Sequence, residues 1–328
     1  MSNKINKIGV LTSGGDSPGM NAAIRSVVRT CAYHKIECVG IYRGYQGMIE
    51  GDFAEMGPRS VNNIVNKGGT ILKSARSTEF RTTEGRKKAH EQLLKAGIDA
   101  LVVIGGDGTF TGGLLFNSEY NFPIIGIPGT IDNDIFGTSH TLGYDTALNT
   151  VVECIDKIRD TAISHNRLFF VEVMGRDAGH IALNAGIGAG AEEILIPEEK
   201  LGLDRLLESL KKSKASGKSS SIVVIAEGDK IGKTVFELKD YVEANLPEYD
   251  VRVSVLGHMQ RGGSPSCFDR VLASRLGVKA VESLMEGKSN YMVGLQNNKV
   301  ELTPLEQAIK SKSEIDIELL RVSDIMST

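Results

Sequence analysis

Two loops carry the residue types that metal-assisted phosphoryl transfer needs. Gly105–Thr109 (GGDGT) places one carboxylate between glycines, and Thr130–Asp134 (TIDND) places two carboxylates two residues apart. A carboxylate beside phosphate oxygens suits Mg²⁺, a hard cation that prefers oxygen ligands. In the second loop, one carboxylate can hold a metal while its neighbour accepts a proton from an attacking hydroxyl. A turn that uses Asp and Asn as backbone acceptors is the structural alternative for this second loop.

Two further loops have the features of anion sites. Thr12–Gly19 (TSGGDSPG) lies between a predicted strand and a predicted helix, so its backbone N–H groups can cradle phosphate. It lacks the Gly-Lys-Ser/Thr ending of a P-loop and the register of a G-x-G-x-x-G motif, and a tight strand-to-helix turn is its alternative. His258–Pro265 (HMQRGGSP) combines His and Arg with paired glycines before another predicted helix, which indicates an anion site.

Four arginines lie close to predicted strands or glycine turns. Most arginines in any protein are solvated surface charges, so composition alone does not raise these four above the background. They are Arg76, Arg167, Arg176 and Arg252.

These loops need a scaffold, and the hydrophobic pattern predicts strands that alternate with helices. Most of the strands are continuous apolar runs, which is typical of parallel sheets covered on both faces. The alternation predicts a doubly wound α/β fold, in which ligands bind beyond the carboxyl ends of strands. The predicted strands are Lys7–Leu11, Cys38–Tyr42, Ala100–Ile104, Ile124–Ile127, Leu168–Val173, Ile194–Ile196, Ile222–Ala226 and Val251–Leu256. The predicted helices are Met20–His34, Arg86–Ala96, Thr146–Thr161, Leu203–Lys214, Lys233–Ala244 and Asp269–Glu286.

The composition is that of a soluble globular protein. The 328 residues correspond to roughly two domains of about 150 residues each. With 41% hydrophobic and 24% charged residues the chain is not disordered, and its net charge of −3 supplies no basic field for nucleic acid or an anionic membrane. The 37 glycines exceed the usual share of about 7% and cluster in pairs, which indicates close approach of the backbone to a ligand.

The cysteines and the N-terminus indicate a reducing compartment. The four cysteines (Cys31, Cys38, Cys154 and Cys267) show no C-x-x-C spacing and no disulfide-framework density, and they predict buried thiols. The first apolar run has four residues, too few for a signal-peptide core, and no stretch approaches the roughly 18 apolar residues of a membrane span. The sequence therefore predicts a cytoplasmic protein without nucleic-acid or membrane partners.

Five motifs together resemble those of bacterial ATP-dependent 6-phosphofructokinases, in the family's order and approximate spacing. They are LTSGGDSPGMNAAIR, VVIGGDGT, PGTIDND, VEVMGR and LGHMQRGGSP. The resemblance covers nearly the whole chain, as far as Gly294–Asn297 (GLQN). It implies a glycolytic kinase that transfers the γ-phosphoryl group of ATP to the 1-hydroxyl of fructose 6-phosphate, giving fructose 1,6-bisphosphate and ADP.

The resemblance also implies the catalytic and nucleotide-binding residues. Asp132 would take the proton of the 1-hydroxyl, and Arg176 would stabilise charge on the transferring phosphoryl group with support from Thr130. Mg²⁺ would bind Asp107 and Asp134. The implied ATP-binding residues are Gly15, Arg76, Ser77, Gly106, Asp107, Gly108 and Thr109.

For the sugar phosphate, the resemblance implies residues from two subunits. His258 and Arg261 would bind the 6-phosphate, which Arg167 and Arg252 would reach from a neighbouring subunit. The implied sugar-binding residues are Thr130, Ile131, Asp132, Arg167, Met174, Gly175, Arg176, Glu227, Arg252, His258, Met259, Gln260 and Arg261.

The resemblance further implies a homotetramer with an effector site for ADP, an activator, and phosphoenolpyruvate, an inhibitor. Two positions depart from the family pattern: Pro58 stands where an arginine is often found, with Arg59 one step along, and Ser216 replaces a basic residue. We therefore expect cooperativity with fructose 6-phosphate to remain and the effector response to be altered. The implied effector residues are Arg25, Arg29, Arg159, Gly190, Glu192 and Lys218.

Two glycines bear on the phosphoryl donor. Pyrophosphate-dependent relatives usually carry Asp and Lys at the positions of Gly108 and Gly129, where bulky charged groups would fill the space of the α-phosphate and nucleoside. The glycines therefore favour ATP. The alternatives are a pyrophosphate-dependent phosphofructokinase, a kinase of the NAD-kinase or lipid-kinase type that shares G-G-D-G-T, and a non-catalytic nucleotide or sugar-phosphate sensor. A sensor would be expected to lack Asp132 or the metal carboxylates.

The family resemblance implies two similar doubly wound α/β domains with mostly parallel sheets and an active site in the cleft between them. The ATP-binding domain is expected at 1–142 and 262–313. The domain for fructose 6-phosphate and effectors is expected at 143–261 and 314–328.

Overall fold

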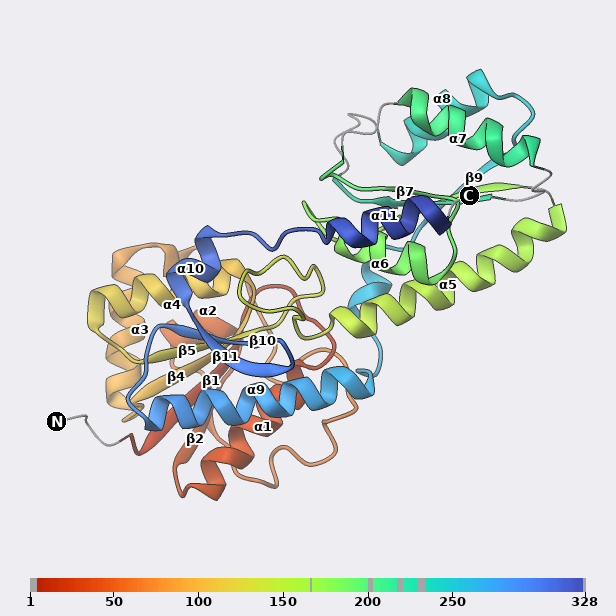
Figure 1. The fold of residues 1–328 in the computed structure, drawn as a ribbon. Helices are drawn as coiled ribbons and strands as arrows, with labels where there is room; N and C mark the ends of the chain where they lie inside the picture. Colours follow the sequence, from red (N-terminus) through yellow and green to blue (C-terminus); the bar gives the residue numbers. More distant parts are fainter. Residues whose placement is uncertain (1–4, 166, 200–202, 217–220, 229–233, 327–328) are drawn as a thin grey trace. The chain divides into compact units, whose positions relative to one another are not determined.

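The computed structural model describes residues 5–165, 167–199, 203–216, 221–228 and 234–326. The chain forms two compact units (Figure 1). The first unit comprises Met1–Ile131, Ile135–Thr146 and Arg261–Ser313, and the second comprises Asp132–Asp134, Ala147–Gln260 and Glu314–Thr328. Within the described ranges, no helix combines the length and the apolar character needed to cross a bilayer.

The first unit is built on one sheet. Its strands are β1 (Lys7–Thr12), β2 (Glu37–Ile41), β3 (Phe53–Glu55), β4 (Ala100–Gly105), β5 (Ile124–Pro128), β10 (Tyr291–Gln296) and β11 (Lys299–Pro304), in the order β11-β10-β5-β4-β1-β2-β3. The pairs β2–β3 and β10–β11 are antiparallel, and the other pairs are parallel. Because β1 pairs with β2 on one side and β4 on the other, the winding direction reverses at β1. Ligands of doubly wound folds bind at such a switch point.

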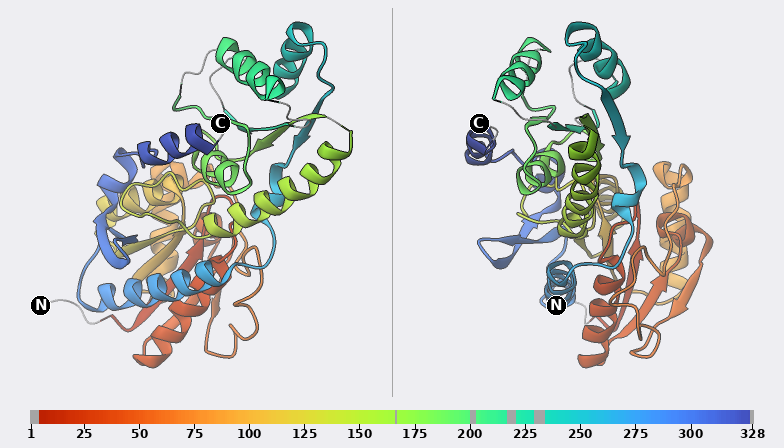
Figure 2. Two further views of the ribbon diagram at one scale, coloured as in Figure 1. Left: turned by 45° about the vertical axis from the view of Figure 1, so that its right-hand side comes forward. Right: turned by 90° about the vertical axis from the view of Figure 1, so that its right-hand side faces the viewer.

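Helices cover both faces of this sheet. They are α1 (Met20–Tyr33), α2 (Gly44–Glu50), η1 (Glu79–Arg81), α3 (Thr83–Lys95), α4 (Asp107–Tyr120), α9 (Cys267–Met285) and α10 (Leu305–Lys310). α1 and α9 lie side by side (Figure 2) and share one core cluster with Val10 and Val102. Leu11 and Val103 belong to the other cluster, with side chains of α2, α3 and α4. Burial of both faces explains the continuous apolar runs in the sequence.

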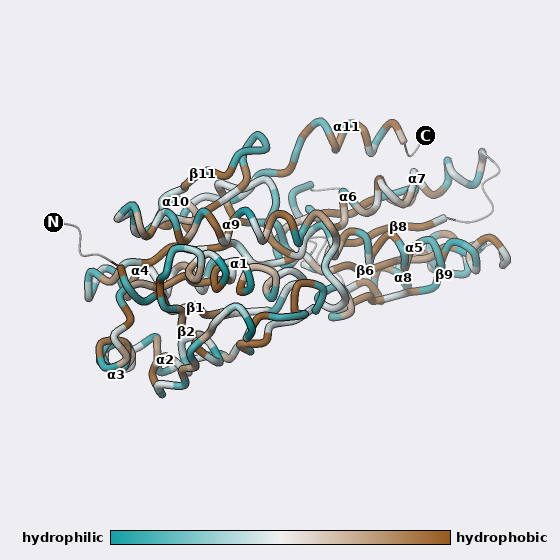
Figure 3. Tube along the Cα trace, turned by 90° about the horizontal axis from the view of Figure 1, so that it is seen from below, coloured by the Kyte–Doolittle hydropathy of each residue, from teal (hydrophilic) through white to brown (hydrophobic). Residues whose placement is uncertain are grey.

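The second unit contains a smaller parallel sheet. Its strands are β6 (Leu168–Val173), β7 (Glu193–Leu195), β8 (Ser221–Ala226) and β9 (Val251–Val255), in the order β7-β8-β6-β9. The winding direction reverses at β6, which pairs with β8 on one side and β9 on the other. The remaining helices are α5 (Tyr144–His165), α6 (His180–Gly188), α7 (Leu203–Ala215), α8 (Val235–Asn245), η2 (Gly257–Arg261) and α11 (Ile317–Met326). Hydrophobic and hydrophilic residues alternate along α11 (Figure 3).

The predicted fold class, α/β with mostly parallel sheets, is confirmed. Each predicted strand is present with ends within one residue of the expected ones, and β6 has the predicted bounds. Elements that the sequence reading missed are β3, β10, β11, α2, α4, α6, α10 and α11. In α4, Gly108, Gly112 and Gly113 weaken the helical pattern. Asn297 and Asn298 join β10 to β11 at positive φ, as in a two-residue hairpin.

The units divide the chain at slightly different places from those expected. The chain crosses between units at 146/147, 260/261 and 313/314, and Asp132–Asp134 groups with the second unit. The crossing at 146/147 comes after the first turn of α5, because Gly143 and Thr146 are hydrogen-bonded to Asp269 of α9. The first unit therefore extends four residues beyond the expected boundary at 142.

Candidate functional site

In the first unit, the loops that follow β1, β4 and β5 are joined at the carboxyl edge of the sheet. The Ser13 N–H donates to the Ile104 carbonyl at 3.0 Å, and Thr109 Oγ1 donates to the Ser13 carbonyl at 3.0 Å. The Gly129 N–H donates to the Gly105 carbonyl at 3.0 Å. The sheet order makes this possible, since β5, β4 and β1 are consecutive neighbours. Three of the four predicted loops therefore meet at the switch point.

The start of α4 has the features of a phosphate site. A Cβ on Gly105 would overlap Thr109 Oγ1 and the Ser13 carbonyl, so this closure of the two loops requires glycine. No side chain caps the N-terminus of α4, whose N–H groups carry partial positive charge. A Cβ on Gly108 would meet nothing within 4 Å, so the surface there is open. Gly106 faces Thr130, with 3.9 Å between its ideal Cβ position and Thr130 Cβ.

The segment that carries Arg76 and Ser77 is fixed to the end of β1. Thr12 Oγ1 donates to the Lys73 carbonyl at 2.9 Å. Ser77 Oγ donates to Gln46 Oε1 at 2.8 Å, so the predicted nucleotide residue Ser77 is held by α2. The Arg76 side chain is exposed and extends from a segment held on both sides.

Tyr45 is a buried residue of this site that the sequence reading missed. Its hydroxyl donates to the Thr109 carbonyl at 2.5 Å, and its ring stacks on Phe80 with centroids 4.1 Å apart. A Cβ on Gly112 of α4 would contact the same ring. Burial raises the pKa of Tyr45 well above its ordinary value, so the hydroxyl stays protonated and remains a donor. A lone tyrosine in the sequence G-Y-Q-G at the start of α2 gives no sequence signal of this role.

The loop after β5 is clamped by the segment that returns toward α5. Thr141 Oγ1 donates to the Thr130 carbonyl at 2.6 Å, and the Leu142 N–H donates to the Pro128 carbonyl at 2.9 Å. Ile131 and Asp132 are buried, and Asp134 is partly exposed.

In the second unit, the loops after β6 and β8 hold three of the predicted sugar-binding residues together. The Arg176 N–H donates to Glu227 Oε1 at 3.0 Å. Gly175 has φ of 143°, and a Cβ there would overlap the Ala178 carbonyl, so the turn requires glycine. Arg176 has φ of 58°, a left-handed conformation that costs a non-glycine residue roughly 1–2 kcal/mol. Its side chain is 70% exposed, with the guanidinium 4.0 Å from Asp177.

The turn η2 is fixed to the end of β6 by a buried glutamine. Gln260 Oε1 accepts the Met174 N–H at 3.1 Å, and Gln260 Nε2 donates to the Gly257 carbonyl at 3.0 Å. Gln260 is one of the predicted substrate residues, and its fully buried side chain stabilises the turn. His258 and Met259 are exposed on the same turn.

Arg261 lies against the loop after β1. Its Nη1 would be 2.9 Å from a Cβ on Gly15, and it donates to the Asp16 carbonyl at 3.3 Å. The family resemblance implies that Arg261 binds the 6-phosphate and that Gly15 contacts the ATP phosphates. The structure places these two residues in direct contact.

Arg167 and Arg252 lie at the opposite end of the second sheet from Met174–Arg176. Both pair with Asp250, at 2.8 and 2.9 Å. Arg167 precedes the first residue of β6 and Met174 follows its last, so the strand separates them by about 20 Å at roughly 3.3 Å per residue. These two arginines therefore do not join the Met174–Arg176 loop within one chain.

The predicted effector residues fall into two groups. In the second unit, Arg159 donates to the carbonyls of Ala189 and Gly190, both at 2.7 Å, and its Nη1 lies 3.7 Å from Glu192. In the first unit, Arg25 and Arg29 line an open groove of about 340 Å³ between α1 and α9. Lys218 lies outside the described residues.

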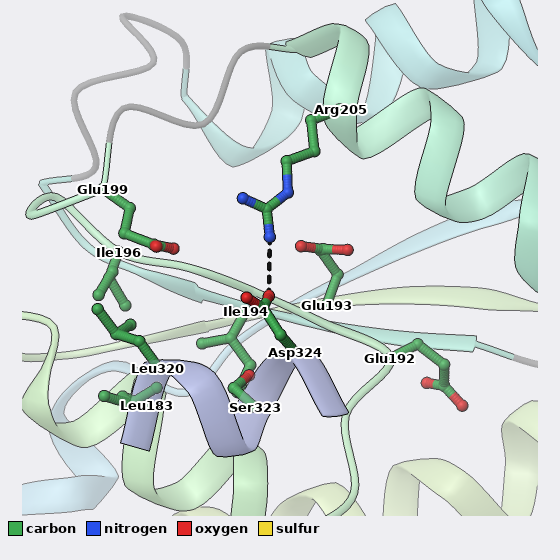
Figure 4. A pocket seen from close by; sticks show the side chains of 10 residues that line it. All are labelled: Leu183, Glu192, Glu193, Ile194, Ile196, Glu199, Arg205, Leu320, Ser323 and Asp324. Atoms are coloured by element: carbon green, nitrogen blue, oxygen red, sulfur yellow. Dashed lines mark hydrogen bonds and ion pairs between the residues drawn. The ribbon is translucent and has the colours of Figure 1, made fainter. Parts of the chain in front are cut away.

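A second cavity lies where α11 meets β7, and it is closed by an ion pair of 2.8 Å between Arg205 and Asp324 (Figure 4). Its volume of about 10 Å³ is that of a single water. Of the predicted site residues it includes Glu192, whose carboxylate accepts the Ile222 N–H at 2.5 Å. This cavity is too small for a substrate.

The carboxylates of the first unit fit Mg²⁺ only in company with phosphate. Among the described residues, no three His, Cys, Asp or Glu side chains form a metal cage. Asp107 supplies one half-buried carboxylate at the start of α4, beside the open surface at Gly108. Mg²⁺ is usually held by one or two carboxylates together with substrate phosphates and water. That donor set matches Asp107 with a bound nucleotide.

Comparison with known proteins identifies a family and close relatives. A family model described as Phosphofructokinase matches residues 7–284. The sequence is 54% identical over 318 residues to the ATP-dependent 6-phosphofructokinase of Cytophaga hutchinsonii, covering 97% of each chain. It is 54% identical over 321 residues to the enzyme of the same name from Bacillus cytotoxicus, covering 98% of this chain and 99% of the relative. Phosphofructokinase from Saccharomyces cerevisiae superposes with a TM-score of 0.89 at 37% identity, covering 98% of this chain and 46% of the yeast chain.

Proposed function

Because the chain belongs to the phosphofructokinase family, we propose that it is an ATP-dependent 6-phosphofructokinase. It transfers the γ-phosphoryl group of ATP to the 1-hydroxyl of fructose 6-phosphate and releases fructose 1,6-bisphosphate and ADP. The observation that carries this proposal is the junction of three loops at the switch point, where the open start of α4 lies beside Thr130.

ATP binds to the first unit in this proposal. The start of α4 and the backbone at Gly15 accept its phosphates, and Arg76 neutralises part of their charge. Asp107 and Asp134 would hold Mg²⁺, which would neutralise phosphate charge and help to orient the γ-phosphoryl group.

Fructose 6-phosphate binds to the second unit, and Asp132 acts as the base. The 1-hydroxyl oxygen forms a bond to the γ-phosphorus as the bond to the bridging oxygen of ADP breaks, and the hydroxyl proton passes to the Asp132 carboxylate. Arg176 stabilises the charge on the transferring group. Glu227 fixes the backbone of Arg176, which supports a shared role for these two residues.

The active site also needs a second copy of the chain. Arg167 and Arg252 lie at the amino ends of β6 and β9, and His258 follows β9 at its carboxyl end. Their separation supports binding of the 6-phosphate by His258 of one copy and the two arginines of its neighbour. We also propose that the chain forms a homotetramer, that ADP and phosphoenolpyruvate bind it as effectors, and that it is located in the cytoplasm.

Gly108 and Gly129 both support ATP as the phosphoryl donor, for different physical reasons. At Gly108 the space beyond the backbone is open and can be filled by nucleotide. At Gly129 a side chain would crowd Ile104 Cγ2 and Met20 Cε, each 3.1 Å from its Cβ position. A lysine there would require the core beneath it to shift.

An assay of the purified full-length chain with Mg²⁺ and fructose 6-phosphate tests the proposal, with ATP compared against pyrophosphate. Rapid formation of fructose 1,6-bisphosphate from ATP alone is expected. Turnover with pyrophosphate would overturn the donor assignment. No turnover with either donor would favour a kinase with a different acceptor or a sensor.

A further inference from the structure

We propose that Asp269 is a positioning residue for phosphoryl transfer. Its carboxylate fixes the return segment, defined as Thr138–Gly143, to the first turn of α9. The return segment in turn holds the loop that leads to Asp132. This inference rests on the proposed function, because it concerns the base that the proposed reaction uses.

Asp269 is fully buried and surrounded by donors. Oδ1 accepts the Gly143 N–H at 2.9 Å. Oδ2 accepts both the N–H of Thr146, at 2.9 Å, and its hydroxyl, at 2.5 Å. Hydrogen bonds to an ionised acceptor are roughly twice as strong as neutral ones, so this carboxylate is a firm attachment for the start of α5.

From Gly143, backbone contacts lead directly to the loop after β5. The neighbouring Leu142 donates to the Pro128 carbonyl at 2.9 Å and forms an isolated bridge with Gly129. Thr141 Oγ1 donates to the Thr130 carbonyl at 2.6 Å. The carbonyl of Thr130 is two residues before Asp132, so movement of the return segment moves the attachment of the base.

On its other side, Asp269 is part of a reciprocal cap between α5 and α9. Ser266 Oγ accepts the Asp269 N–H at 3.2 Å and donates to Asp145 Oδ2 at 2.5 Å. The Ser266 N–H donates to Thr146 Oγ1 at 2.9 Å. Ser266 directly follows Gly262–Pro265, so the same bonds fix the end of the loop that carries Arg261.

The loop after β1 packs against the same point. The ideal Cβ position of Gly19 lies 3.7 Å from Asp269 Cβ, and that of Gly143 lies 2.7 Å from Ser17 Cβ. The return segment and the end of the loop that carries Arg261 are therefore held from one buried carboxylate that itself lies outside the motifs, and the loop after β1 only packs beside it. The contacts of Ser13 with Ile104 and Thr109 do not involve Asp269, so the nucleotide loops keep independent support.

Asp269→Asn tests this role, because it keeps the shape of the side chain but replaces one accepting oxygen with an NH₂ group. That NH₂ group would face the donors of Gly143 or Thr146. A misplacement of about 1 Å can cost about 10²-fold in rate, so we expect kcat to fall by about 10- to 100-fold. The KM for ATP should stay within about threefold, because the nucleotide loops are held separately. Thr234→Ala is the matched control: it removes the N-cap of α8 in the second unit and should leave kcat unchanged.

A second pair of variants keeps the test decisive if Asp269→Asn does not fold. Thr146→Val removes the hydroxyl that bonds Asp269 and should lower kcat, whereas Thr146→Ser retains it and should restore turnover. A kcat within twofold of wild type in folded Asp269→Asn or Thr146→Val would overturn the proposal. So would a fall in kcat that Thr234→Ala reproduces.

Hydrogen exchange separates failure of this inference from failure of the proposed function. Faster exchange of the Leu142 and Gly143 amides in Asp269→Asn is expected whether or not the chain turns over ATP. If wild type shows no kinase activity but exchange accelerates, the proposed function fails and the attachment stands. Unchanged exchange in the variant would overturn the attachment itself.

Discussion

Arg176 is held in a strained backbone conformation with its guanidinium exposed, beside a glutamate that fixes its N–H. Backbone strain of this kind is often found where a side chain must be aimed at a ligand. We expect Arg176→Ala to lower kcat by about 10²–10³-fold, the usual cost of removing a transition-state charge stabiliser, with little change in KM.

Steady-state kinetics with fructose 6-phosphate and ATP measure this effect. Arg205→Ala is the matched control, since Arg205 is another exposed arginine of the second unit and pairs with Asp324. A higher KM with unchanged kcat would mean that Arg176 only binds substrate.

Single residues also show what the sequence could not reveal. The motifs identified the loops, but Gln260 is buried by its contacts with Met174 and Gly257, a role that depends on tertiary packing. Arg261 likewise contacts Gly15, about 245 residues earlier in the chain, through a turn whose path no local pattern encodes. Residue types predict the chemistry of a loop, and packing decides which side chains remain available for it.

At the scale of elements, the junction of α5 with α9 predicts a pH dependence of stability. Burial raises the pKa of Asp269 to about 6, although donors from Thr146 and Gly143 oppose this. The pKa of Asp in an unfolded chain is about 3.9. Between these values the folded chain binds more protons than the unfolded chain, so the free energy of unfolding falls as pH rises from about 4 to 6, by up to roughly 3 kcal/mol.

Urea unfolding of wild type and Asp269→Asn across this pH range isolates the contribution of Asp269. The stability of wild type relative to the variant should fall as pH rises through the window. A difference that does not vary with pH would contradict the raised pKa.

Elements were predictable where hydrophobic burial alone dictates them. The strands β1, β4 and β8 are apolar on both faces, and their runs predicted them within one residue. α4 was missed because its glycines have low helix propensity. Gly112 instead makes room for the Tyr45 ring, and Gly108 leaves the surface open. β11 was missed because it alternates polar and apolar residues as an edge strand.

At the scale of the whole molecule, the opposite placement of Arg167 and Met174 predicts active sites shared between copies. Asp132→Ser and Arg167→Ala should each be nearly inactive as pure proteins. Co-expression of the two should restore activity, because a hybrid can combine Asp132 of one copy with Arg167 of its neighbour. Activity of purified hybrids measures this, and the absence of any recovery would place both residues of each site in one chain.

The effector response is a second property of the whole assembly. Pro58 and Ser216 are exposed and supply no cation, and a lost hydrogen bond to a charged group costs about 1.5–3 kcal/mol. We expect the rate to depend sigmoidally on fructose 6-phosphate and the response to ADP and phosphoenolpyruvate to be altered. The double variant Pro58→Arg with Ser216→Lys should strengthen the response to both effectors. Titration of the wild-type enzyme with ADP and with phosphoenolpyruvate measures the effector response. Normal sensitivity of wild type to both effectors would contradict the expected alteration.

The most direct test of the account is the turnover of Asp132→Ser. We assign the base to Asp132, in the loop that β5 and the return segment hold in place, so loss of this carboxylate should abolish almost all turnover. Binding of ATP and fructose 6-phosphate, measured by calorimetry, should change by no more than a few-fold. A near-normal kcat in the folded variant would contradict the assignment of Asp132 as the base and of its loop as the site of phosphoryl transfer.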